Sequence, residues 1–294
     1  MNITTSKRTV ATATERAASF QAFRSQVLYP LGMHALMLLG VFIIVFPLLY
    51  AIILSTQSSE EYYQVGNLVP GASAAHNYQT AWQNADMGRL ISNTLVVSLG
   101  VAFGKIILSI TAAFALIFFR VRGGMLILGL IMLTHLLPLP VRIVPTYDLL
   151  TNLGWINTFW GLTIPFFASA TGVLLFQQFF RTVPTDLADA ARVDGAGPLR
   201  YLFGILIPIS RTNIGALFLI EFVYMWNQYL WPLLVANTPD TRQIQIGIKQ
   251  LVPTDAVVPW GILMAAAITA IIPPLVVLLL LQKSLMAGLT ADQD

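Results

Sequence analysis

The feature that most constrains this chain is a series of apolar runs, each long enough to cross a lipid bilayer as a helix. Six such runs cover residues 29–54, 92–119, 125–143, 158–180, 212–235 and 259–281. About 20 helical residues span the hydrocarbon core of a membrane. Only helices and closed barrels satisfy the backbone in lipid, and the runs lack the period-two alternation of barrel strands. The sequence therefore predicts an all-α integral membrane protein with six transmembrane helices.

The composition excludes one large soluble domain. Charged residues make up 10% of the 294 and hydrophobic residues 56%, whereas a soluble domain carries about 25% charged residues. The chain has no cysteine, which excludes disulfides, cysteine metal sites and thiol nucleophiles. The three histidines, His34, His76 and His135, are scattered along the sequence, so we expect no metal site.

The basic residues set the expected orientation. If the N-terminus is cytoplasmic, 11 of the 16 lysines and arginines fall on the cytoplasmic side, as the positive-inside rule requires. These are Lys7, Arg8, Arg16, Arg24, Arg120, Arg122, Arg181, Arg192, Arg200, Arg211 and Lys283. We therefore expect both termini inside, with residues 1–28 as a cytoplasmic tail and 29–294 as the six-span domain. Because this asymmetry explains the basic balance, we expect no nucleic-acid partner.

The polar segment 181–211, between the fourth and fifth runs, has a helical pattern of its own. Thr185 fits the N-cap position of a helix that begins at Asp186. Asp186 and Asp189 then lie in the first turn, where the helix dipole favours carboxylates. The segment therefore predicts a helix outside the membrane.

The residues that follow predict a turn and a second helix. Ala190 and Ala191 are small enough for another protein to approach the helix backbone. Gly195 fits a turn that a side chain would obstruct if its φ is positive. Pro198 suits the first position of a second helix, and Pro208 is expected to break or kink that helix at the entry to the fifth run. These residues alone fit either a connector lying on the membrane or a docking element for a soluble partner.

The spacing in this loop resembles the coupling motif of the membrane subunits of binding-protein-dependent ABC importers. That motif is Glu-Ala-Ala, three residues, Gly, nine residues, Ile, one residue, Leu-Pro. The chain has Asp189-Ala190-Ala191, Gly195, Ile205 and Ile207-Pro208 at these positions. It departs from the family at Asp189, where Glu is usual, and at Ile207, where Leu is usual. Because Asp is shorter than Glu, any salt link made by the family's acid must be re-aimed here.

The resemblance implies the fold of a type I ABC importer permease, multi-pass in the bacterial cytoplasmic (inner) membrane. The partners it implies are a second permease subunit, two ATP-binding subunits, an extracytoplasmic substrate-binding protein and membrane lipid. ATP and Mg would be bound by the ATPase subunit, with no cofactor in this chain. Coupling to the ATPase would fall to Asp186, Asp189, Ala190, Ala191, Asp194, Gly195 and Pro208.

Within the family, the chain resembles the maltose-type class of sugar and glycerol-3-phosphate permeases. The stretches that carry this likeness are 161–165 with 168–171, 176–180, 226–234 and 247–249. They are most similar to the second membrane subunit of the glycerol-3-phosphate importer. The resemblance thus implies transport of sn-glycerol-3-phosphate or glycerophosphodiesters, with a maltose-type sugar as the alternative. A secondary transporter or channel is a further alternative, although few charges lie within the runs.

The stretch 100–106 superficially suggests a phosphate-binding loop. Its spacing is one residue short, and Ile106 stands where a hydroxyl would meet magnesium. Gly100 and Gly104 are better explained as a close helix contact of the small-xxx-small kind. The chain is therefore expected to lack a nucleotide site and to hydrolyse no ATP by itself.

Two charges, Lys105 and Glu221, fall near the middle of their apolar runs. Charges inside a membrane are costly and usually face a cavity or each other. Either they pair as a structural link, or Lys105 faces the translocation path, where it could meet an anionic substrate. Both interpretations stay open from the sequence.

Other polar residues are weaker candidates. His135 and Arg142 could contact a phosphate, or be a buried histidine and an interfacial anchor. Trp226, Asn227, Gln228 and Tyr229 end the fifth run, as pathway or gate residues or as an aromatic belt. Gly247 and Lys249, in the external loop 236–258, could contact the binding protein or belong to a plain exposed loop.

Overall fold

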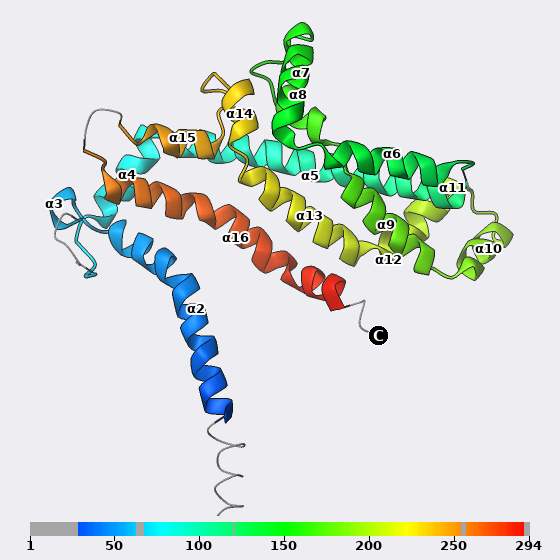
Figure 1. Ribbon diagram of the computed structural model, residues 1–294, viewed down its shortest axis with the longest axis horizontal. Helices are drawn as coiled ribbons and strands as arrows, with labels where there is room; N and C mark the ends of the chain where they lie inside the picture. Colours follow the sequence, from blue (N-terminus) through cyan, green and yellow to red (C-terminus); the bar gives the residue numbers. More distant parts are fainter. Residues whose placement is uncertain (1–28, 63–67, 120, 254–256, 291–294) are drawn as a thin grey trace, which may run out of the picture.

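The computed structural model describes residues 29–62, 68–119, 121–253 and 257–290, and the regular structure there is entirely helical (Figure 1). The all-α prediction is confirmed. The cytoplasmic tail expected over residues 1–28 lies outside the described residues.

Three helices are long and apolar enough to cross a membrane: α2 (Tyr29–Leu54), α5 (Met87–Phe118) and the Trp260–Lys283 part of α16 (Trp260–Thr290). α2 contacts α16 near its C-terminal end and otherwise projects away from the other helices in Figure 1, and the apolar window of α2 has no buried residue. A helix that is apolar on all sides requires apolar surroundings. We therefore expect α2 to face lipid or another subunit.

Two further apolar segments are bent. In the first, α8 (Phe159–Thr163) and the 3₁₀ turn η2 (Ile164–Phe166) meet α9 (Ala170–Thr182) at 47°. In the second, Pro198–Ile209 meets α13 (Arg211–Trp226) at 74°. Pro208 lacks the N–H that would bond the carbonyl of Gly204, and the residues just before it form a π-helical stretch (η3, Leu202–Leu206). The chain stays helical through Pro208 and bends at Ser210, so a kink close to the predicted position is confirmed.

The third apolar run differs from its prediction. Instead of one helix over 125–143, the chain forms α6 (Gly124–Leu136) and α7 (Leu139–Asn152). Leu137 is extended, with ψ 119°, because it precedes Pro138, whose ring disfavours the helical region there. The 13 residues of α6 reach about 20 Å, short of the ~30 Å hydrocarbon core. By length and composition the described residues contain three continuous candidate spans, or up to five with the bent pairs, so the count of six is not confirmed.

The remaining elements are short and connect these helices. They are α3 (Ser59–Tyr62), α4 (Ala74–Asn84), α10 (Thr185–Val193), α11 (Pro198–Tyr201), α12 (Ile207–Ile209), α14 (Leu230–Val235) and α15 (Ile244–Gln250).

Helix α5 is the central element of the fold. It packs along α9 and α13, and its residues contribute to each of three hydrophobic core clusters. A Cβ on Gly104 would lie 2.5 Å from the ring of Phe167, and one on Gly100 would lie 3.4 Å from Thr163. These glycines therefore allow close approach of the bent segment formed by α8, η2 and α9, as the small-residue spacing predicted.

Candidate functional site

The exposed helix-turn-helix at one end of the molecule begins with α10 (Figure 1). Pro184 is the N-cap of α10, and no side chain caps it. The prediction that Thr185 is the N-cap is wrong by one residue, because Thr185 is already helical. Asp186 and Asp189 are exposed, as expected of residues available to a partner.

The two alanines of the motif have different environments. Ala190 is exposed, whereas Ala191 is buried in the core cluster that includes Phe114 and Tyr201. Only Ala190 thus offers backbone access to a partner. Ala191 holds α10 against its own chain.

Gly195 turns the chain between α10 and α11 with φ of +72°. The N–H of Asp194 bonds the carbonyl of Ala190 at 3.0 Å, and the N–H of Ala196 bonds that of Ala191 at 2.8 Å. Residues with side chains rarely adopt this backbone conformation, so the predicted turn at Gly195 is confirmed, and its part in coupling stays a prediction. Pro198 opens α11, also as predicted.

A cluster that sequence reasoning missed ties α10 to the end of α5. Arg192 Nη1 lies 2.8 Å from Asp189 Oδ1, and the Arg192 guanidinium lies 5.3 Å from the centre of the Phe118 ring. The Phe118 and Tyr201 rings are 5.7 Å apart. These residues border a pocket of about 220 Å³ between α10, α5 and α11. The sequence signal that could have revealed this cluster is Arg192, which stands three residues after Asp189, the acid of the motif.

Lys105 and Glu221 lie together inside the helix bundle. Lys105 Nζ is 2.5 Å from Glu221 Oε2, and the two side chains are 10% and 9% exposed. Ser169, which caps α9, donates to Glu221 Oε1 at 3.4 Å, and Tyr224 places its ring 5.3 Å from Lys105 Nζ. Of the two interpretations left open by the sequence, the structure therefore shows the pairing of Lys105 with Glu221. A substrate contact by Lys105 stays a prediction.

The residues that end the fifth run have separate environments. Trp226 is buried, and its indole N–H donates to the carbonyl of Ala270 at 3.1 Å, which holds α13 to α16. The amide of Asn227 is exposed and donates to Val223 of its own helix at 2.8 Å. Tyr229 is 39% exposed and Gln228 is half-buried.

The two candidate phosphate contacts lie on different helices. Arg142 is exposed on α7, at a small pocket that Thr146 and Trp231 also line. His135 belongs to α6, and its side chain lies outside the described residues. In the described part of the chain, no three His, Asp or Glu side chains could hold a metal ion together.

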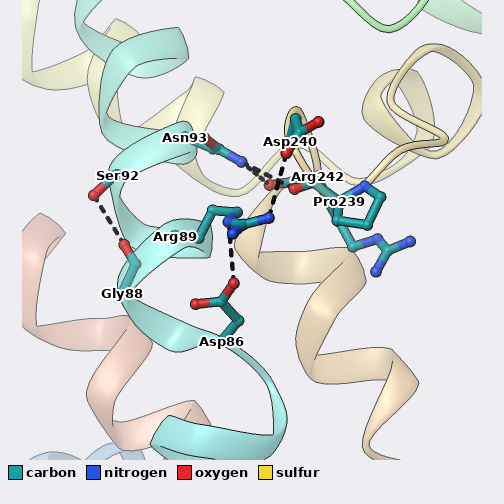
Figure 2. A network of polar contacts seen from close by, with 8 residues as sticks. All are labelled: Asp86, Gly88, Arg89, Ser92, Asn93, Pro239, Asp240 and Arg242. Atoms are coloured by element: carbon teal, nitrogen blue, oxygen red, sulfur yellow. Dashed lines mark hydrogen bonds and ion pairs between the residues drawn. The ribbon is translucent and has the colours of Figure 1, made fainter.

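The loop before α16 is fastened to the first turns of α5 (Figure 2). Asn93 Nδ2 donates to the carbonyl of Arg242 at 3.0 Å, and Arg89 reaches Asp240 at 3.3 Å. Gly247 is buried against Leu90, where a Cβ would collide with the leucine methyls. Lys249 is exposed. Of the two predicted contacts with a binding protein, only Lys249 presents a side chain at the surface.

Fold and site together define a class: a helical membrane protein that presents an exposed helix-turn-helix at one end of its apolar helices. Residues 105–290 match the binding-protein-dependent transport system inner membrane component family. The chain belongs to this family, so it is a permease subunit and not an enzyme.

Its relatives include sn-glycerol-3-phosphate transport system permease proteins named UgpE. The protein from Rhizobium meliloti (strain 1021) is 45% identical over 269 residues, which cover 88% of this chain and 95% of the relative. The protein from Escherichia coli O6:K15:H31 is 39% identical over 268 residues, with the same coverage.

Two solved structures share the fold. One is a bacterial ABC transporter involved in the import of the acidic polysaccharide alginate, with a TM-score of 0.80 and 20% identity over 88% of this chain and 97% of that chain. The other is a bacterial alginate ABC transporter in complex with a periplasmic protein that holds an alginate pentasaccharide. Its TM-score is 0.61 at 17% identity, over 88% and 96% of the two chains. These likenesses establish a type I permease fold.

Proposed function

We propose that this chain forms half of the translocation path of an ATP-driven importer of sn-glycerol-3-phosphate or glycerophosphodiesters. The substrate assignment rests on the 45% identity, over 88% of the chain, to a permease protein of sn-glycerol-3-phosphate transport. The substrate class is therefore a small organophosphate anion.

The proposal assigns the ATPase contact to the exposed face of α10 and to the turn at Gly195. This face supports the assignment because it carries two exposed carboxylates and Ala190, whose small side chain lets a partner approach the backbone. A separate subunit binds ATP and Mg, and closure of two such subunits moves α10 and the spans attached to it. Coupling of this kind requires two global states that both partners bias.

The proposal also includes the orientation and the other partners. Both termini lie in the cytoplasm, residues 1–28 form a tail, and the loop 181–211 meets the ATPase. A second permease subunit covers part of the exposed apolar surface of this chain, and membrane lipid covers the remaining apolar surface. An extracytoplasmic binding protein delivers the substrate to the opposite side, where Lys249 is exposed.

The test is ATP hydrolysis by the complete complex in liposomes with its binding protein. Glycerol-3-phosphate is added in one assay and maltose in a parallel assay. Stimulation by glycerol-3-phosphate alone supports the proposal. Stimulation by maltose alone would move the substrate to a carbohydrate, and failure of the chain to co-purify with an ATPase would reject the importer itself.

A further inference from the structure

Helix α5 carries contacts to two separate surface elements, one near each of its ends. The loop that contains α15 touches its first turns, and the helix-turn-helix of α10 and α11 touches its last turn (Figure 1). The whole of α5 has 32 residues, and the contacts at Asn93 and Phe118 lie about 38 Å apart along it at 1.5 Å per residue.

The first joint is made of hydrogen bonds from two buried residues of α5. Asn93 and Thr94 are 7% and 1% exposed. Asn93 donates to the carbonyl of Arg242, and Thr94 Oγ1 accepts from the N–H of Ile244 at 2.9 Å (Figure 2 shows the Asn93 bond). Buried bonds to backbone groups are costly to break. The loop therefore follows α5 when this helix moves.

Packing reinforces this joint. Leu90 on α5 is buried against Gly247 of α15, where no side chain would fit. The exposed ion pair between Arg89 and Asp240 adds little, because solvent screens it.

The second joint is the contact of Phe118 with Arg192. The guanidinium lies over the ring, and its fork also binds Asp189, which is part of the proposed ATPase contact. Because this ion pair is exposed, most of the strength of the joint comes from the buried cluster that Ala191 of α10 and Tyr201 of α11 share with Phe114 of α5. Arginine suits this double role because its planar group stacks on aromatics and binds carboxylates at once. Movement of α10 is thus transmitted to the end of α5.

The helix between the joints lacks the strongest helix breaker. The sequence of α5 contains no proline, and proline is a main cause of sharp helix kinks. The middle of the helix is fixed to α13 by the pair of Lys105 and Glu221.

We propose that α5 is the rigid link through which the loop that contains α15 (residues 236–259) and the helix-turn-helix of α10 and α11 act on one another. Thr94 and Arg192 are its positioning residues, one at each joint. This inference rests on the proposed function, in which the loop faces the binding protein and α10 faces the ATPase. Neither residue touches substrate or nucleotide in this scheme.

The experiment compares Thr94→Val and Arg192→Met in the complete complex in liposomes. Thr94→Val removes the hydroxyl that bonds the loop and keeps the shape. Its control is Thr111→Val, because the Thr111 hydroxyl bonds only carbonyls of its own helix. The control for Arg192→Met is Arg200→Met, an exposed arginine of the same loop. The readouts are ATP hydrolysis without binding protein and with the loaded binding protein.

Both test variants are expected to lose about fivefold or more of the stimulation by binding protein, measured as the ratio of stimulated to unstimulated hydrolysis. Thr94→Val, which lies far from the proposed ATPase contact, should also keep the unstimulated hydrolysis of the wild type. The double variant should lose no more stimulation than the more impaired of the two single variants, because both changes interrupt the same route. Thr94→Ser, which retains the hydroxyl, should restore stimulation.

Stimulation of either test variant at the level of its control would overturn the inference, and so would losses that multiply in the double variant. If Arg192→Met fails to assemble, Phe118→Leu tests the same joint by removing the aromatic face. Wild-type complex that shows no stimulation by binding protein would instead reject the proposed function.

Discussion

At the scale of single residues, backbone conformation explains the glycine of the coupling motif. Gly195 has φ of +72°, and no atom lies within 4 Å of a Cβ built on it. A side chain there would therefore strain the backbone without colliding with this chain. The requirement is local, which is why the sequence alone could predict it.

Gly195→Asp is expected to reduce ATP-driven uptake while the spans stay inserted, because a side chain at φ of +72° strains the turn that orients α10 and adds a charge to the proposed ATPase contact. The matched control is Gly197→Asp. Gly197 has equally open surroundings and is the N-cap of α11, where aspartate is favoured. Uptake into proteoliposomes and membrane insertion are measured for both variants. Normal uptake by Gly195→Asp would contradict the assignment.

The buried pair of Lys105 and Glu221 leads to a second residue-scale prediction. Lys105→Met leaves Glu221 buried without its cation, a change that typically costs about 3–5 kcal/mol. The double variant Lys105→Met/Glu221→Met should recover part of this loss, since no charge then stays buried. Thermal unfolding of the purified complex in detergent measures both effects. A single variant as stable as the wild type would show that the pair contributes nothing.

At the scale of helices, proline decides how an apolar run is divided. Pro138 interrupts a helix that hydropathy would continue, and Pro208 lies two residues before the bend at Ser210. The sequence analysis anticipated the bend close to Pro208, where the flanking segment is polar. It missed the break at Pro138, because hydropathy averages over a run and is insensitive to one extended residue.

The division of the third run allows a test of the span count. If α6 and α7 cross the membrane together, a reporter enzyme that is active only outside, fused after Leu153, will be active. If α6 stays on the cytoplasmic side, the same fusion will be inactive and a fluorescent reporter will fold there. The control is a fusion after Val121, in the short loop before α6, which is expected to be cytoplasmic in either case.

At the scale of the whole molecule, charge asymmetry predicts the orientation in the membrane. Fluorescent reporters fused to the N-terminus and to the C-terminus should both fold in the cytoplasm, because most basic residues flank that side. An outside-active enzyme fused in the loop near Lys249 should be active. Opposite results at the two termini would mean an odd number of spans and would contradict the predicted topology.

The sequence by itself determined the class of this protein. Hydropathy follows from composition along a run, and the coupling motif follows from spacing within one loop, so both can be recognised without tertiary contacts. The helical membrane fold, the turn at Gly195, the start of α11 at Pro198 and the kink close to Pro208 were all predictable for this reason.

Only the tertiary structure decided which residues meet. Lys105 and Glu221 are 116 positions apart, and their pairing depends on the faces that α5 and α13 turn to each other. The burial of Gly247 against Leu90 and the stacking of Arg192 on Phe118 likewise depend on packing between distant segments. Hydropathy and spacing describe one segment at a time, whereas contacts between helices depend on their relative rotation and register.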